Sequence, residues 1–123
     1  MFEERPRTKL GDSLRLQFRQ RSLRCEVLGP HPENGNYALR WFMIPSEEPP
    51  PSHERPRECL AIAELWDEVQ EEAKAHGIHH ALIGSGYVEG TKYYCLDVVF
   101  PPTELMAAYQ FQLEFGRQPG RGR

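Results

Sequence analysis

The chain has 123 residues, of which 39% are hydrophobic and 27% are charged, and its formal net charge is −3. This length supports one domain, and the apolar share supports a hydrophobic core, which excludes wholesale disorder. A membrane-spanning helix is excluded because no run of about 18 apolar residues occurs. The chain starts with acidic residues and a proline instead of the apolar run of a secretory signal, so we expect a cytoplasmic protein.

The spacing of cysteine and histidine does not indicate a metal site. The three cysteines are Cys25, Cys59 and Cys95, and no two of them form a CxxC pair. An odd number with this spacing fits neither a disulfide framework nor structural zinc. The nearest histidine group is His76, His79 and His80, but a glycine divides it, and adjacent strand residues point to opposite faces. We therefore expect no metal and no cofactor.

Charge is distributed unevenly along the chain. Residues 1–24 hold seven basic and three acidic residues, whereas residues 25–77 hold four basic and eleven acidic residues. Residues 78–123 hold four of each. Such segregation has two interpretations: the basic and acidic faces of the domain neutralise each other, or one of them binds a partner.

The N-terminal part begins with a polar segment, residues 1–12, which we expect to be an arm. Residues 13–28 then show strand-like alternation, because Leu14, Leu16 and Phe18 alternate with polar residues. The apolar residues that follow are odd-numbered, which one flat strand does not allow. We favour one bulged strand, since no glycine or asparagine marks a turn, and a hairpin is the alternative.

The next segments are a turn, a strand and a loop. Residues 29–35 are rich in turn-forming residues. Residues 36–44 follow as a largely apolar strand, which we expect near the centre of the sheet. Residues 45–57 contain five prolines, which cannot donate backbone hydrogen bonds, so this segment is predicted as a long loop.

The clearest element is a helix over residues 60–76, which Gly77 ends. Its apolar stripe comprises Ile62, Leu65, Trp66, Val69 and Ala73. Its outer face carries Glu64, Asp67, Glu68, Glu71 and Glu72. Like charges four residues apart destabilise a helix by about 0.2–0.5 kcal/mol per pair unless a cation lies nearby. This acidic face is either solvated or docks a basic surface of a partner.

The C-terminal half adds a hairpin and a final helix. Residues 78–83 and 92–100 are predicted strands, joined by a connection at 84–90 whose glycines suit turn geometry. Residues 103–115 begin with helix formers and end with strand-like alternation. We favour one helix because nothing breaks the segment, and a short helix plus a strand is the alternative. Residues 116–123 are predicted to be a basic, mobile tail.

These elements predict a single α+β domain over residues 13–115. The expected architecture is an antiparallel sheet of four or five strands with two helices on one face. One arrangement of these elements is a ferredoxin-like split β-α-β core with the N-terminal strand or strands at a sheet edge.

A catalytic candidate follows from the predicted hairpin. If the hairpin closes symmetrically, His80 lies across from Cys95, and Asp97 lies two residues further along the same face. A thiol beside an imidazole that a carboxylate orients is the arrangement of a nucleophilic cysteine. Nothing in the sequence fixes this register, and the alternative is that Cys95 is an ordinary buried residue.

A basic strand face is the basis of a nucleic-acid alternative. It comprises Arg15, Arg19 and Arg21, and the tail adds Arg121 and Arg123. Such a ribbon could follow a phosphate backbone. Aromatic residues for base stacking are missing from this face. The other interpretation is a solvated edge strand whose charges deter aggregation.

The sequence therefore predicts a small non-catalytic binding or regulatory protein that acts through protein–protein contacts, with the acidic helix face as its partner-binding surface. A nucleic-acid-binding module is the alternative, and a small cysteine-dependent enzyme is the second alternative. A homo-oligomer is compatible with the sequence, and we expect no membrane association.

Overall fold

The computed structural model describes residues 8–51 and 56–116. Its helices are α1 (Lys9–Arg19), α2 (Arg57–Ala63), α3 (Trp66–Ala75) and α4 (Leu105–Gly116), the last preceded by a 3-10 turn at Pro102–Glu104. Its strands are β1 (Arg24–Leu28), β2 (Tyr37–Pro45), β3 (Leu82–Val88) and β4 (Tyr93–Phe100). Residues 1–7 of the predicted arm and 117–123 of the predicted tail lie outside the described residues.

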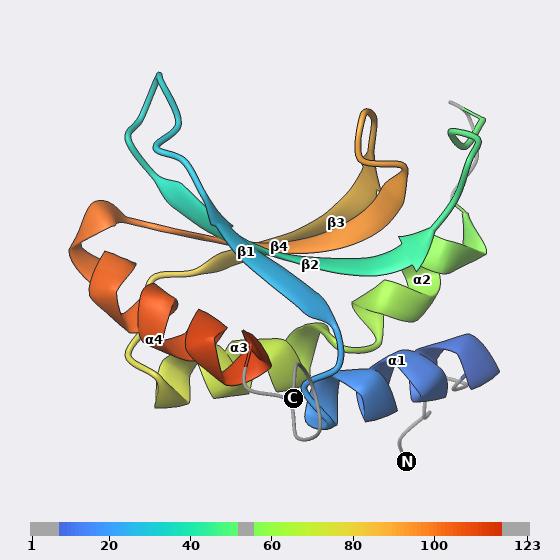
Figure 1. The fold of residues 1–123 in the computed structure, drawn as a ribbon, viewed down its shortest axis with the longest axis horizontal. Coiled ribbons are helices and arrows are strands. Elements are labelled where there is room, and N and C mark those ends of the chain that lie inside the picture. The colour runs from blue at the N-terminus through green and yellow to red at the C-terminus, as the bar shows by residue number, and fades with distance from the viewer. Residues whose placement is uncertain (1–7, 52–55, 117–123) are drawn as a thin grey trace, which may run out of the picture.

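The four strands form one antiparallel sheet in the order β1-β2-β4-β3. The helices lie on the same side of this sheet, and among the described residues none lies on the other side (Figure 1). The predicted α+β class, with an antiparallel sheet covered on one face, is confirmed. β2 is a central strand, as expected, and β1 and β3 are the edge strands.

The order of elements differs from that of a ferredoxin-like domain. β2 and β3 both run antiparallel to β4, which lies between them in the sheet. In the chain, α2 and α3 connect β2 to β3. The chain, however, starts with a helix and two strands, whereas a ferredoxin-like chain has the order β-α-β-β-α-β. The ferredoxin-like detail of the prediction is therefore not confirmed.

Helix α1 shows that the prediction of a strand or hairpin over residues 13–28 was wrong in its first half. Leu14 and Phe18 lie four residues apart on the buried face of the helix and are 1% and 0% exposed, whereas Leu16 is 55% exposed. Two of the three alternating apolar residues thus have helical spacing. Thr8 caps the helix, because its hydroxyl accepts a backbone N–H three residues later at 2.9 Å. The buried apolar residues change from even-numbered to odd-numbered positions because the chain passes from helix α1 into strand β1.

The predicted helix over residues 60–76 is two helices, α2 and α3. At Glu64 and Leu65 the backbone N–H groups donate to carbonyls three residues earlier, at 3.2 and 2.9 Å, which makes a tighter turn. The carbonyl of Glu64 accepts a hydrogen bond from Arg15 of α1 at 2.9 Å. A contact with a distant helix therefore accompanies the break, and no proline or glycine marks it in the sequence. α2 also begins within the predicted loop at 45–57.

The predicted β3–β4 hairpin is present, but its register differs from the expected one. Gly84 and Gly86 lie inside β3, and the turn follows at residues 89–92. Gly86 is therefore the residue opposite Cys95. The segment after β4 continues as α4, so the favoured single helix is confirmed.

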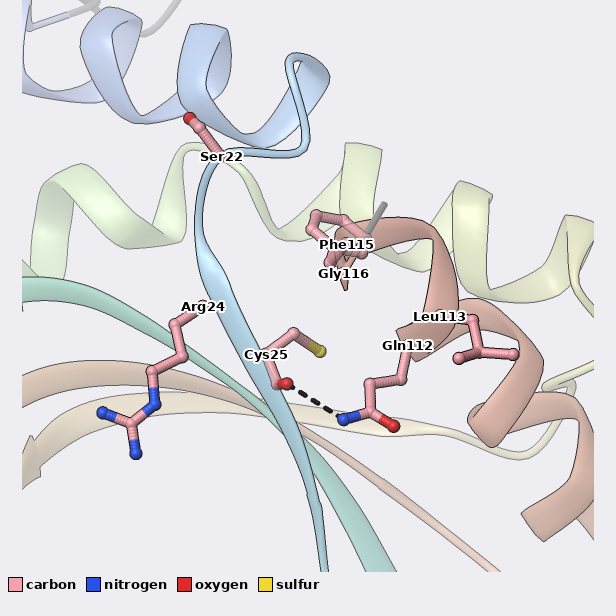
Figure 2. A pocket seen from close by; sticks show the side chains of 7 residues that line it. All are labelled: Ser22, Arg24, Cys25, Gln112, Leu113, Phe115 and Gly116. Carbon is pink, nitrogen blue, oxygen red and sulfur yellow. Dashed lines mark hydrogen bonds between the residues drawn. The ribbon is translucent and has the colours of Figure 1, made fainter. Parts of the chain in front are cut away.

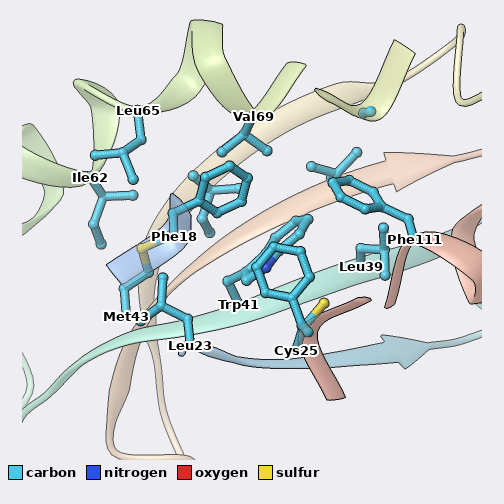
Figure 3. Close-up of a cluster of buried hydrophobic side chains, with 14 of the residues drawn as sticks. Phe18, Leu23, Cys25, Leu39, Trp41, Met43, Ile62, Leu65, Val69 and Phe111 are labelled. Carbon is cyan, nitrogen blue, oxygen red and sulfur yellow. The ribbon is translucent and has the colours of Figure 1, made fainter. Parts of the chain in front are cut away.

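The core lies between the covered face of the sheet and the helices. Trp41 of β2 is at its centre, with ring centroids 5.4–5.7 Å from those of Phe18, Phe111 and Phe115. Figure 3 shows Trp41 beside Phe18 and Phe111, together with Ile62, Leu65 and Val69 from α2, the turn after it and α3. Because every helix contributes, the core fixes the position of the whole helical layer.

Candidate interaction surfaces

The predicted basic and acidic surfaces face each other within the chain. Arg19 Nε lies 2.7 Å from Glu68 Oε2, and Arg15 Nε lies 3.2 Å from Glu68 Oε1. Arg21 Nη2 lies 2.7 Å from Glu72 Oε1. The cations that relieve the like-charge repulsion on α3 thus come from α1 and the turn after it. This geometry supports the intramolecular interpretation of the uneven charge.

Glu64 also acts inside the chain. Its carboxylate accepts a hydrogen bond from the Thr8 hydroxyl at 2.8 Å, at the N-terminus of α1, where negative charge is stabilising. Of the five acidic residues predicted to bind a partner, Asp67 and Glu71 are exposed, whereas Glu64, Glu68 and Glu72 are half-buried. The predicted docking surface is therefore reduced to two carboxylates.

The nucleic-acid alternative loses its surface for the same reason. Arg15, Arg19 and Arg21 do not form a strand face, and each lies beside a glutamate of α3. A phosphate backbone would have to displace these contacts before gaining its own. The other two predicted residues, Arg121 and Arg123, lie outside the described residues.

The structure places the catalytic candidates Cys95 and Asp97 on one face of β4, as predicted, but His80 does not lie opposite Cys95. His80 precedes β3, and its Nδ1 lies 2.8 Å from Glu104 Oε2. Asp97 instead holds Arg40 through two hydrogen bonds of 2.9 Å. Burial raises the pKa of the Cys95 thiol in spite of the nearby Arg40 cation. A thiol that ionises less readily, with no imidazole opposite it in the sheet register, does not support a nucleophilic cysteine.

Glu104 is a buried carboxylate that the sequence did not indicate as important. It accepts hydrogen bonds from the backbone N–H groups of His79 and His80 at 3.1 and 3.3 Å. Burial raises the pKa of this carboxyl, but the hydrogen bonds from His80 and the two backbone groups outweigh that effect and lower it. Glu104 therefore anchors the chain between α3 and β3.

His76 joins α3 to α4. Its Nε2 lies 2.7 Å from Glu114 Oε2, its Nδ1 lies 2.8 Å from the carbonyl oxygen of Glu72, and its ring stacks on Phe111 at 4.3 Å. Arg21 also approaches Glu114, at 3.4 Å. Partial burial lowers the pKa of His76, but the bonds to Glu114 and to the Glu72 carbonyl raise it above its ordinary value. The contact with Glu114 was not predicted, because the two residues are far apart in sequence.

The uncovered side of the sheet, which we call the open face, is organised in rows of cross-strand neighbours. The rows are Arg24, Phe42, Cys95 and Gly86; Glu26, Arg40, Asp97 and Gly84; and Leu28, Ala38, Val99 and Leu82. Four of these twelve residues are charged. Phe42 and Cys95 are buried, whereas Leu82 is 73% exposed and Val99 is half-buried. A sheet face in contact with water is ordinarily polar, so the exposed apolar area around Leu82 and Val99 is typical of a contact surface.

The charges of the open face cancel in pairs. Arg24 Nη2 lies 2.6 Å from Glu26 Oε2, and Arg40 is paired with Asp97. Arg24 also lies over the ring of Phe42, with its guanidinium carbon 4.2 Å from the ring centroid. Two cations balanced by two carboxylates give no excess positive charge to attract phosphates, so this face does not support nucleic-acid binding either.

Gly84 and Gly86 leave a hollow in the open face. Neither has a positive φ, and a Cβ atom added at either would meet no atom within 4 Å. A cavity of about 320 Å³ lies over them, and Cys95, Asp97 and Val99 of the neighbouring strand β4 also line it. Glycine in a strand is destabilising by about 0.5–1 kcal/mol relative to alanine. Neither the backbone nor the packing within the described chain requires these two glycines.

A second cavity lies beside the free edge of β1. Its volume is about 480 Å³, and Cys25, Gln112 and Leu113 are among its lining residues. Figure 2 shows Gln112 of α4 reaching across to the carbonyl oxygen of Cys25, at 3.2 Å. This cavity is a groove between the edge strand and α4.

Helix α4 is apolar on both of its sides. Phe111 and Phe115 face the core, whereas Met106, Tyr109 and Leu113 are 73%, 45% and 53% exposed. The exposed residues have spacings of three and four and so form one stripe along the helix. The described part of the chain does not cover this exposed apolar stripe, although a surface helix of a globular protein usually presents polar residues to solvent.

Two further classes of site are not found in the described part of the chain. No group of three or more metal-ligating side chains could hold a metal ion among these residues, and His76, His79 and His80 do not form one. No helix there is both long and apolar enough to span a membrane. Comparison of the chain with protein-family models, with curated proteins and with solved structures found no match.

Proposed function

We propose that the protein is a small non-catalytic binding protein that acts through protein–protein contacts made by the open face of its sheet. The observation that carries this proposal is the hollow above Gly84 and Gly86, where two costly glycines have no role within the described chain. Glycines in a strand are characteristic of places where another backbone or ligand approaches closely.

The composition of the open face favours a protein as the partner. It combines apolar contact area at Val99 and Leu82 with the paired charges of Arg40 and Asp97. A mixture of this kind, close to electrically neutral, resembles a protein–protein interface. The proposed surface replaces the acidic face of α3, because the glutamates there are already occupied by α1.

A photo-cross-linking experiment tests the proposal. A photoreactive phenylalanine analogue is placed at Val99 of the open face and, as a control, at Glu71, which is exposed on α3. We expect position 99 to give a discrete cross-linked protein in the cells that make this chain, and position 71 to give none. The adduct should persist after nuclease treatment and decrease in a Gly84→Val background, whose side chain fills the hollow.

Two results would contradict the proposal. One is equal cross-linking from positions 99 and 71, which would indicate nonspecific contact. The other is an adduct that nuclease removes, which would indicate a nucleic acid as the partner. In either case the open face would lose its assignment as a protein-binding surface.

A further inference from the structure

The free edge of β1, the groove beside it and the exposed stripe of α4 together form one continuous surface. β1 pairs with β2 on one side, and on its other side no strand pairs with it among the described residues. Leu113 belongs both to the groove and to the apolar stripe of α4. Unpaired strand edges next to apolar surface are sites where another chain adds to a sheet.

The backbone groups of β1 show which residues face outward. The carbonyl of Cys25 accepts a hydrogen bond from Gln112, so it points away from β2. In an antiparallel strand the N–H and C=O of one residue point to the same side and alternate along the strand. The outward-facing groups of β1 are therefore those of Cys25 and Val27. A carbonyl oxygen has two lone pairs, so Cys25 can accept a second hydrogen bond without losing Gln112.

A second copy of the chain is the partner that the charges of this edge favour. When β1 pairs antiparallel with itself about a two-fold axis at Cys25, Arg24 of each copy lies opposite Glu26 of the other. The Arg24–Glu26 pair within each copy, at 2.6 Å, then becomes part of a network of four alternating charges across the axis. Moving the axis one residue along, to Glu26, brings the two Glu26 carboxylates together, which is unfavourable. Of these two registers, the one with the axis at Cys25 places opposite charges across the interface.

The helix beside β1 is also compatible with self-association. Only residues that lie on a two-fold axis meet their own copy, so a charged residue on the axis would be repelled by its equivalent. The stripe of Met106, Tyr109 and Leu113 is uncharged, and Glu114 is engaged by His76 on another side of α4. Covering this stripe would remove exposed apolar side chains from water, which stabilises an interface.

We propose that the chain forms a two-fold symmetric homodimer in which β1 pairs antiparallel with β1 of a second copy, with the axis at Cys25. The two sheets then become one sheet of eight strands, since each copy contributes four. A two-fold axis perpendicular to the sheet places both open faces on the same side. The dimer does not depend on the proposed binding function, but it would give that function a continuous double surface.

Charge reversal at Arg24 and Glu26 tests the dimer. In Arg24→Glu, acidic residues at 24 and 26 meet acidic residues of the second copy, and in Glu26→Arg, basic residues meet basic ones. Replacing attraction by repulsion at two symmetric pairs should weaken each homodimer by about 10-fold or more. A 1:1 mixture of the two variants restores opposite charges across the axis, so a heterodimer should form with close to the wild-type dissociation constant.

The measurements are sedimentation equilibrium for the dissociation constants and native mass spectrometry for the composition of the mixture. Lys92→Glu is the matched control, because Lys92 is an exposed cation that lies outside β1 and pairs with Glu47. It should dimerise like the wild type. Circular dichroism of each variant establishes that the fold is retained.

The proposal is overturned if the wild-type chain stays monomeric up to about 100 µM, a concentration at which weak interfaces are populated. It is also overturned if a dimer forms but the mixture shows no preference for the heterodimer, since another surface would then hold the copies together. Cross-linking from Val99 to a different protein tests the proposed function separately, so failure of one experiment leaves the other intact.

Discussion

The two faces of the sheet come from the same four strands and yet have opposite chemistry. One row of the covered face is Cys25, Trp41, Leu96 and Ser85, and the neighbouring row of the open face is Arg24, Phe42, Cys95 and Gly86. On the covered face, helices remove water, so an unpaired charge would be costly. On the open face, charges occur as pairs, and two of the three rows end in glycine. Packing against the helices therefore restricts the residues of the covered face, whereas the residues of the open face are not restricted in this way.

The largest expected difference between the faces is in their aromatic residues. Trp41→Ala removes the centre of the core and should lower the free energy of unfolding by about 3–5 kcal/mol. Phe42→Ala, on the open face, loses the contacts with Arg24 and Tyr93 and the burial of a ring that is 7% exposed, but no helix packs on this side, so we expect a smaller loss, about 1.5–3 kcal/mol. Urea unfolding followed by circular dichroism measures both. Equal losses would show that the faces are equally well packed.

The next effect concerns the charge pairs of the open face. Arg40→Met leaves Asp97 partly buried without its cation and should cost about 1–2 kcal/mol, between the values for exposed and buried pairs. Arg24→Met breaks a more exposed pair with Glu26 and should cost less than about 1 kcal/mol. The same unfolding measurement compares them. A larger loss for Arg24→Met would mean that the edge of the open face is more desolvated than its centre.

The glycines of β3 should respond in the opposite direction. Gly84→Ala and Gly86→Ala should each stabilise the protein by about 0.5–1 kcal/mol, because alanine restricts the unfolded chain and its Cβ meets no atom here. Thermal unfolding detects this as a higher melting temperature. If both variants also lose cross-linking from Val99, stability and binding are in competition at this hollow. Destabilisation by either substitution would reveal a packing role for that glycine.

The smallest expected effect is the pH dependence of the contact that fastens α4 over the covered face. The pKa of His76 is raised above its ordinary 6.5, so its contribution to stability is complete below that value and is lost as pH rises through the folded pKa. The His76 hydrogen bond lowers the pKa of Glu114 below its ordinary 4.5, so its contribution is complete above that value and is lost as pH falls through the folded pKa. The pair should therefore contribute most between these two ordinary values.

His76→Gln tests this dependence. The difference in melting temperature between wild type and variant should be largest between about pH 5 and 6 and should shrink at higher pH, with a free energy of about 0.5 kcal/mol because both groups are partly exposed. His79→Gln is the control, since its side chain lies outside this contact. A difference that stays constant with pH would mean that stacking on Phe111, and not charge, is the main contribution of His76.

The residue pattern alone predicted a segment correctly where its secondary structure did not depend on contacts with distant residues. The apolar run of β2 predicted a central strand, and the unbroken run before residue 116 predicted α4, both correctly. It failed in α1, where Leu14, Leu16 and Phe18 satisfy strand alternation while two of them also have helical spacing. Thr8 as a cap was the available indication of a helix in the sequence, and the packing of Phe18 against Trp41 favours the helix in the fold.

The sequence by itself determined the fold class, the central strand, the last helix and the segregation of charge. The tertiary structure decided that the charges of α1 and α3 neutralise each other, that the helix after the loop breaks at Glu64, and that Gly86 and not His80 lies opposite Cys95. The physical reason is the same in each case. Periodicity reports which side of an element is apolar, whereas ion pairs, breaks and registers depend on residues that are distant in sequence and meet only when the elements pack.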